Sequence, residues 1–123
     1  MAEGKIVYIA SPYAGDTAAN TAFARAACRL AVWQGDVPVA AHLLYPQILD
    51  DSVPEQRELG IGLGTRLLGA CSELWLCGGR ISGGMHEELE AALRLGIPVR
   101  HIPWRAVAEF MRQPAEEKAG GSP

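Results

Sequence analysis

Four short apolar runs, separated by longer segments with helical character, constrain this chain more than any other feature. The runs span residues 5–10, 38–41, 73–77 and 97–102. Strands that alternate with helices are typical of βαβ units, whose strands pair in parallel. The first and third runs are continuously apolar, as strands buried on both faces are. The pattern predicts an α/β fold with a mostly parallel sheet.

Helices are predicted between these strands. The expected spans are about 17–34, 54–71, 84–95 and 104–112. Asp16 or Thr17 can cap the first helix, and Gly96 can end the third. A chain of 123 residues is long enough for one domain with its own core. We assign that domain to residues 1–112 and expect the polar segment 113–123 to be disordered.

Composition excludes several function classes. The net charge is −3 and no basic stripe is present, which argues against a nucleic acid polymer as partner. No apolar run reaches the roughly 20 residues of a membrane span, and the first residues lack a signal-peptide layout. The three cysteines show no C-x-x-C spacing, so we expect reduced thiols in a cytoplasmic protein. No spacing of histidines and acids predicts a metal site, and no cofactor is expected.

The stretch from Ser82 to Ala92 combines a glycine turn, a helix start and acidic residues directly after a buried strand. Glycine loops and helix N-termini bring free backbone N–H groups close to a ligand. A carboxylate near the helix start is stabilised in its ionised form by the helix dipole. It can act as a nucleophile, although acids in a first turn are also common as simple dipole partners.

Three glutamates compete for a functional role in this helix. Helical residues are about 100° apart, so Glu87, Glu88 and Glu90 cannot all face the sheet edge. Glu88 lies beside the apolar face of Ala91 and Ala92 and can point toward the neighbouring loops, whereas Glu90 is expected to face water. Glu88 is therefore the candidate catalytic carboxylate.

Ligands of parallel sheets bind beyond the carboxyl ends of the strands. Those ends carry residues 11–13, His42 and residues 78–84. His42 either contacts a ligand or caps its strand in solvent. His86 and His101 are interpreted as structural or solvated. Ser11 and Ser82 can donate to a phosphate or a sugar hydroxyl, although a serine before a helix is also an ordinary cap.

The helix predicted at 54–71 contains Gly60, Gly62 and Gly64, which do not have the spacing of a dinucleotide fingerprint. Close packing against this helix is the preferred interpretation. Its apolar residues exceed what one side of a small sheet can cover: Leu59, Ile61, Leu63, Leu67 and Leu68. A homo-oligomer, at least a dimer, is therefore expected.

The chain resembles the nucleoside 2-deoxyribosyltransferase-like superfamily, in particular a small uncharacterised branch of it, over residues 5–102. Three stretches carry the resemblance: Lys5-Ile-Val-Tyr-Ile-Ala-Ser-Pro-Tyr-Ala-Gly15, Ala41-His-Leu-Leu-Tyr-Pro46, and Ser82-x-Gly-Met-x-x-Glu88-Leu-x-x-Ala92. The resemblance implies a Rossmann-like or flavodoxin-like three-layer sandwich. It also implies an enzyme that cleaves the N-glycosidic bond of a nucleoside or nucleoside 5′-monophosphate, by transfer or hydrolysis.

The resemblance assigns roles to single residues. Glu88 matches the glutamate that attacks the anomeric carbon, and Tyr8 matches a strand tyrosine that hydrogen-bonds near it. Substrate contacts are implied for the other motif residues: Ser11, Pro12, Tyr13, Gly15, His42, Tyr45, Ser82, Gly84 and Met85. Among these, Ser11, Gly15 and Ser82 could together form a phosphate nest.

The chain departs from the superfamily pattern at two places. Ser82 occupies the position where transferases often carry an aspartate, and the region of a second aspartate is occupied by residues 60–64. These departures favour an alternative function, a non-catalytic nucleotide-binding or sensor protein on the same fold. Glu88 and Tyr8 together favour the enzyme.

Overall fold

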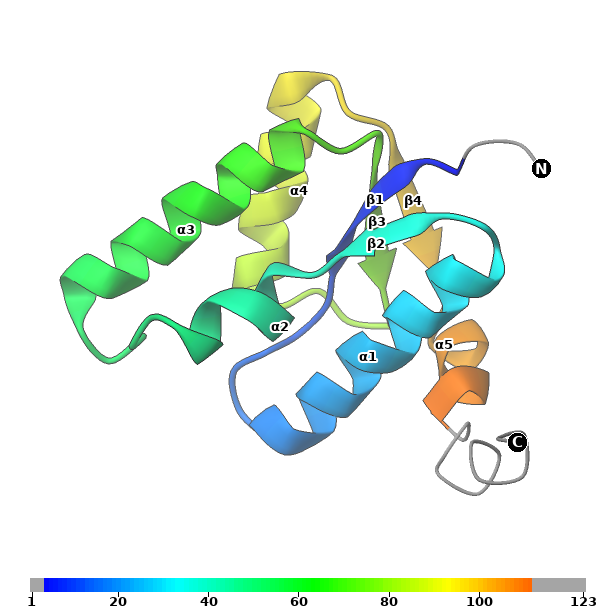
Figure 1. Ribbon diagram of the computed structural model, residues 1–123, viewed down its shortest axis with the longest axis horizontal. Helices are drawn as coiled ribbons and strands as arrows, with labels where there is room; N and C mark the ends of the chain where they lie inside the picture. The colour runs from blue at the N-terminus through cyan, green and yellow to red at the C-terminus, as the bar shows by residue number, and fades with distance from the viewer. Residues whose placement is uncertain (1–3, 112–123) are drawn as a thin grey trace, which may run out of the picture.

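The computed structural model describes residues 4–111 and shows a parallel sheet between two layers of helices (Figure 1). The strands are β1 (Ile6–Ala10), β2 (Val37–Val39), β3 (Glu73–Cys77) and β4 (Val99–Ile102). They lie in the order β2-β1-β3-β4 and every neighbouring pair is parallel. The α/β fold is confirmed, and the strand order follows that of flavodoxin-like sheets.

Helices cover both faces of the sheet. Their bounds are α1 (Thr17–Trp33), α2 (Ala41–Leu44), α3 (Pro54–Gly69), α4 (Gly83–Leu95) and α5 (Trp104–Met111), with a 3₁₀ turn η1 (Tyr45–Gln47) after α2. Helices α1 and α5 pack on one face, and α3 and α4 on the other (Figure 1). Asp16 caps α1 by accepting the Ala19 N–H at 3.1 Å, and Gly96 ends α4 with φ at 73°. Both caps were predicted.

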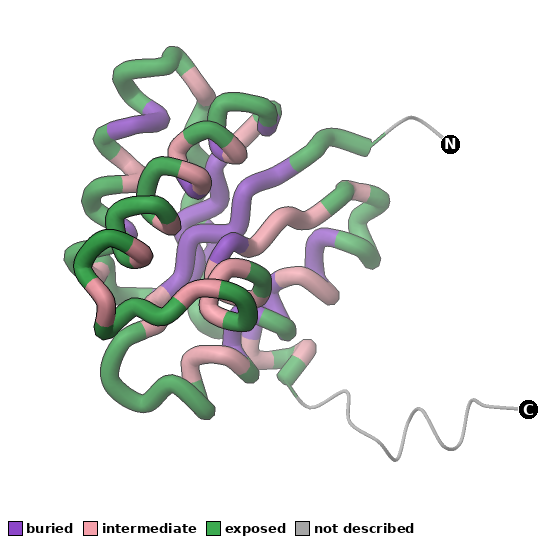
Figure 2. Tube along the Cα trace, turned by 60° about the vertical axis from the view of Figure 1, so that its left-hand side comes forward, coloured by how far each residue is buried: buried purple, intermediate pink, exposed green. Residues whose placement is uncertain are grey.

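The alternation of side chains along β1 divides the core into two clusters. Val7 and Ile9 belong to the cluster beneath α1 and α5, whereas Tyr8 and Ala10 belong to the cluster beneath α2, α3 and α4. Figure 2 shows the buried residues concentrated along the central strands. Because successive strand residues point to opposite faces, Tyr8 is directed toward the side that carries α4.

The second predicted strand needs a correction. We expected residues 38–41 with His42 at the strand end, but β2 stops at Val39 and Ala41 begins α2. This edge strand has a partner on one side only, and the Ala-His-Leu-Leu segment contains good helix formers that leave the sheet. His42 therefore lies on a short helix.

Other predictions concern covalent state, membranes and the tail. Cys28, Cys71 and Cys77 carry free thiols. Within residues 4–111, no helix has the length and apolar character required to cross a bilayer. The predicted disordered tail at 113–123, and the last residue of the predicted C-terminal helix, Arg112, lie outside the described residues.

Candidate functional site

A tyrosine and a glutamate meet between the sheet and α4. The hydroxyl of Tyr8 donates to Oε2 of Glu88 at 2.6 Å. Tyr8 is only 1% exposed, so its hydroxyl needs a partner inside the protein. Gly64 on α3 lies beside this hydroxyl, since a Cβ at that position would be in van der Waals contact with it at 3.4 Å. One carboxylate oxygen is thereby fixed by a rigid central strand.

The environment of Glu88 favours its neutral form. Burial raises the pKa of Glu88 to about 7, the Tyr8 hydrogen bond acts in the opposite direction, and the charge of Glu87 raises it further. Its second oxygen, Oε1, is buried and has no hydrogen-bond partner in the described part of the chain. An unsatisfied buried polar atom costs about 1–3 kcal/mol, and such groups are often retained for chemistry. Glu88 can therefore change charge near neutral pH.

Tyr8 remains a hydrogen-bond donor throughout this range. Burial raises the pKa of Tyr8 well above its ordinary value, and the neighbouring Glu88 charge raises it further. A phenol that stays protonated can hold the carboxylate in one orientation in either of its charge states.

A cavity of about 410 Å³ lies beside Glu88. This volume is within the range of small-molecule sites. The wall is built by the start of α4, the loop after β1, the α2–η1 segment and one face of α3. Polar and aromatic side chains of the wall include Tyr13, His42, Tyr45, Asp51, Arg57, Thr65, Glu87 and Glu88.

One wall of this cavity is an aromatic pair. The rings of Tyr13 and His42 stack with centroids 5.1 Å apart and planes inclined by 21°. Burial lowers the pKa of His42, and the nearby Asp51 charge opposes that change. Both residues line the cavity, and aromatic rings can stack against planar ligands.

The N-terminus of α4 forms a second part of the wall. Oγ of Ser82 accepts the Met85 N–H at 3.3 Å, which makes Ser82 the N-cap. Gly83 and Gly84 follow and also line the cavity. The first N–H groups of a helix have no acceptor within it, and they attract anions.

The structure brings most of the predicted site residues together. Those that line the cavity are Tyr8, Tyr13, His42, Tyr45, Ser82, Gly84 and Glu88. Four predicted residues do not line it: Ser11, Pro12, Gly15 and Met85.

Three of these four residues have a clear place elsewhere in the fold. Ser11 is 1% exposed and its hydroxyl has no partner in the described chain. Gly15 lies in an exposed turn with φ at 98°. Met85 is buried in the core cluster of Tyr8. The suggested phosphate nest of Ser11, Gly15 and Ser82 is therefore not assembled on this wall, where only Ser82 is present.

The contribution of α3 was not predicted. Its cavity residues are Arg57, Gly60, Ile61, Gly64, Thr65 and Leu68. They recur every three or four residues, which is the period of one helix face, and this regularity is the signal that could have identified them. Close packing was correctly inferred for Gly64. A Cβ at Gly62, in contrast, would meet nothing within 4 Å.

The remaining histidines lie outside the cavity wall. His86 is exposed on α4 and its Nδ1 lies 3.8 Å from Oε2 of Glu90. The Nε2 atom of His101 lies 3.1 Å from the Gly78 carbonyl oxygen. These surroundings agree with solvated and structural roles.

The profile of a family described as Domain of unknown function (DUF7768) matches residues 5–102. No curated protein matches the chain. The matched region contains the four strands and every residue of the cavity wall.

Proposed function

The chain belongs to the DUF7768 family, and from its site we propose that it cleaves the N-glycosidic bond of a nucleoside, a deoxynucleoside or a nucleoside 5′-monophosphate. The observation that carries this proposal is the state of Glu88. One of its oxygens is held by Tyr8, the other has no partner, and the residue borders a cavity suited to a small molecule. A positioned carboxylate of this kind can act as a nucleophile.

The chemistry follows from the charge that develops on the sugar. As the base departs, the anomeric carbon acquires oxocarbenium-like character. Ionised Glu88 stabilises this charge and forms a bond to the carbon, which gives a covalent glycosyl-enzyme. Attack by water completes hydrolysis, and attack by a second base completes transfer. Tyr8 keeps the carboxylate oriented in both steps.

The walls of the cavity suggest how a substrate lies. The Tyr13–His42 pair offers a stacking surface for a planar base. The N-terminus of α4, with Ser82 and Gly84, offers N–H groups to a 5′-phosphate. Glu88 lies on the same helix and lines the same cavity.

The direct test is incubation of the purified protein with a panel of nucleosides and nucleoside 5′-monophosphates, followed by measurement of free base. We expect base release from at least one of them and none from the Glu88→Gln variant. Glu90→Gln is the matched control, because Glu90 is on the same helix and is exposed. Ligand binding without base release would instead support a non-catalytic nucleotide-binding protein, the function favoured by the absence of the two superfamily aspartates.

The role of the phosphate can be tested by binding. If the N-terminus of α4 takes a phosphate, nucleoside monophosphates should raise the melting temperature more than the corresponding nucleosides do. Equal shifts would indicate a nucleoside enzyme.

We also propose that a second copy of the chain covers α3. Leu59 and Ile61 are 58% and 48% exposed, and Ile61 also lines the cavity. Their burial in a dimer would remove apolar surface from water and enclose the site. Light scattering should give at least a dimer mass, which Leu59→Glu should reduce. A monomer mass for the wild type would contradict this assembly.

A cytoplasmic location is proposed because Cys28, Cys71 and Cys77 carry free thiols.

A further inference from the structure

Cleavage of the N-glycosidic bond requires a proton donor for the departing base, and the Tyr8–Glu88 pair does not supply one. A nucleobase that is neutral in the substrate and takes the bonding electrons would leave as an anion. It is therefore a poor leaving group unless it also receives a proton. Glu88 is used as the nucleophile, and the Tyr8 hydroxyl is already directed at Glu88. If the proposed function is correct, on which this inference rests, the proton must come from another group of the cavity.

The cavity contains one residue whose chemistry suits this task. Imidazole is the only side chain whose ordinary pKa lies between 5 and 8, and His42 is the only histidine among the residues described on the wall. The other charged or titratable groups on the wall are Tyr8, Tyr13, Tyr45, Asp51, Arg57, Glu87 and Glu88.

The surroundings of His42 leave its nitrogens available. The ring stacks on Tyr13, and neither nitrogen hydrogen-bonds to any residue in the part of the chain the structure describes. Burial lowers the pKa of His42, which makes the imidazolium a ready proton donor. The Asp51 charge acts in the opposite direction and favours the protonated state.

We propose that His42 donates the proton that the departing base requires, and that Asp51 stabilises the imidazolium before transfer. A carboxylate oxygen of Glu88 bonds to the anomeric carbon while the carbon–nitrogen bond breaks. The bonding electrons go to the base, which receives the proton of His42 on a ring nitrogen. Water then hydrolyses the glycosyl ester, and the proton it releases returns to the imidazole.

The experiment compares two kinds of leaving group on the same sugar. Adenosine and AMP carry a base that needs a proton to depart. Nicotinamide riboside and nicotinamide mononucleotide carry a pyridinium, which departs as a neutral molecule without one. Both pairs are tested in ribose and 2-deoxyribose forms, with kcat/KM measured from base release.

Two variants separate proton donation from shape. His42→Gln keeps polarity, and His42→Phe keeps a flat ring against Tyr13, but neither can donate a proton. Both should lose about a hundredfold in kcat/KM on the adenine substrates. On the pyridinium substrates His42→Phe, which keeps the ring, should stay within about threefold of wild type. Glu88→Gln should impair both kinds of substrate. His86→Gln, exposed and outside the cavity, is the control for a lost histidine.

The pH dependence provides a second measurement. The reaction needs ionised Glu88 together with protonated His42, and because the pKa of Glu88 is raised to about 7 while that of His42 is lowered, this combination is a minor state. With the adenine substrates, wild-type kcat/KM should therefore pass through a maximum, rising through the lower of the two pKa values and falling through the higher. In His42→Gln the fall should disappear, and kcat/KM should rise with pH through the pKa of Glu88 alone. A fall that persists in this variant would exclude His42 as the donor, whether or not the pyridinium substrates bind.

Other outcomes also overturn the assignment. Wild-type rates for His42→Phe on AMP would make His42 a stacking surface, and equal losses on both kinds of substrate would make it a shape determinant. Cleavage of pyridinium substrates alone by the wild type would show that no proton donor acts, while Glu88 would keep its role. A wild type that cleaves neither kind refutes the proposed function itself, and the role of His42 with it.

Discussion

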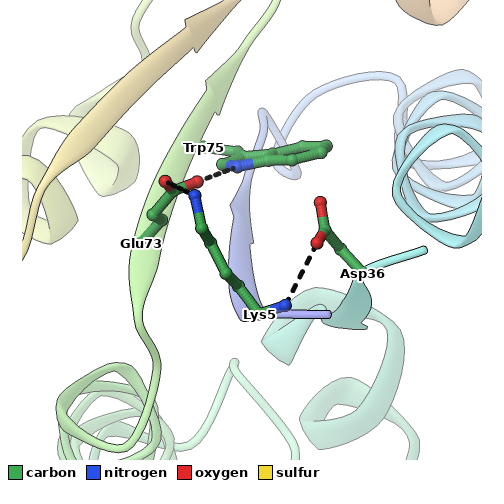
Figure 3. Close-up of polar contacts among 4 residues, drawn as sticks. All are labelled: Lys5, Asp36, Glu73 and Trp75. Carbon is green, nitrogen blue, oxygen red and sulfur yellow. Dashed lines mark hydrogen bonds and ion pairs between the residues drawn. The ribbon is translucent and has the colours of Figure 1, made fainter. Parts of the chain in front are cut away.

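The glutamates near the two ends of the sheet, Glu73 and Glu88, have different hydrogen-bonding environments. At the amino ends of the strands, Glu73 accepts hydrogen bonds on both oxygens, from Lys5 Nζ at 2.8 Å and from Trp75 Nε1 at 2.9 Å (Figure 3). The backbone N–H of Lys5 donates to Asp36 at 3.1 Å, which ties β1 to the start of β2. The Lys5 and Trp75 hydrogen bonds hold the pKa of Glu73 below its usual range.

Toward the carboxyl ends of the strands, some buried polar atoms have no hydrogen-bond partner in the described chain. Oε1 of Glu88 and Oγ of Ser11 are buried without a partner in the described chain, and burial raises the pKa of Glu88. Glu73 thus has a hydrogen-bond donor for each oxygen and favours its ionised form, whereas burial favours the neutral form of Glu88. Exceptions to local rules of stability are expected where a protein does chemistry. This difference indicates a structural role for Glu73 and supports the catalytic role proposed for Glu88.

The largest expected effect is on catalysis. Glu88→Gln keeps the shape of the side chain but removes the nucleophilic charge, so kcat should fall at least about a hundredfold on any substrate found by the panel. Glu73→Gln should leave kcat unchanged, because Glu73 lies away from the cavity wall. Similar losses in both variants, measured by base release, would mean that the two ends are not functionally distinct.

The next effect concerns stability at the amino end. Glu73→Ala removes the acceptor of the Trp75 N–H, and Trp75 is fully buried. We expect a loss of about 1–3 kcal/mol in the free energy of unfolding, measured with urea at pH 7. Glu73→Gln retains an acceptor and should lose less. Because the folded pKa of Glu73 is depressed, its ionic contribution should disappear as pH falls through that pKa. An unchanged free energy of unfolding in Glu73→Ala would contradict the stabilising role of Glu73.

A related effect has the opposite sign at Glu88. Its folded pKa of about 7 lies above the ordinary unfolded value of about 4.3. The folded state therefore binds more protons between these values, and wild-type stability should decline as pH rises through them. Glu88→Gln cannot ionise and should lack this decline. The free energy of unfolding of the variant should therefore exceed that of the wild type by an amount that grows from pH 5 to pH 8 and reaches about 1–3 kcal/mol. Thermal melts across this range test it, and parallel pH curves for the two proteins would contradict it.

The smallest effect tests the contact that supports Tyr8. Glycine to alanine within a helix usually stabilises by about 0.5–1 kcal/mol. Gly62→Ala should show this gain, because its Cβ would meet nothing within 4 Å. At Gly64 the new Cβ would lie 3.4 Å from the Tyr8 hydroxyl, at the short limit of ordinary van der Waals contact, so we expect a smaller gain in stability and a slightly lower kcat. Identical behaviour of the two variants would show that Gly64 has no part in positioning Tyr8.

The fold was largely predictable because its signals are local. Continuous apolar runs identified β1 and β3, and Asp16 and Gly96 marked helix ends. The position of His42 was not predictable in the same way. Whether a short edge segment continues as strand or turns into helix depends on which neighbours it finds in the folded sheet.

The candidate site was predictable in part for a similar reason. Glu88 could be separated from Glu90 by helical geometry, and the structure places the first on the cavity wall and the second outside it. The face of α3 was missed because its members, such as Arg57 and Thr65, are ordinary surface residues of a helix until a cavity is built against them. Ser11 was included by its position in the sequence, whereas its burial depends on how tightly the layers close over β1.

The Tyr8–Glu88 hydrogen bond joins residues separated by 80 positions in the sequence. A nascent chain that has exposed β1, α1 and β2 still lacks the glutamate, and the pair cannot form before α4 has been synthesised and docked. Contacts of such long separation form late relative to local helices, since the intervening loop must first be closed. Recovery of activity during refolding should therefore lag behind recovery of helical circular dichroism. Formation of the Tyr8–Glu88 hydrogen bond would then indicate that the tertiary structure is complete.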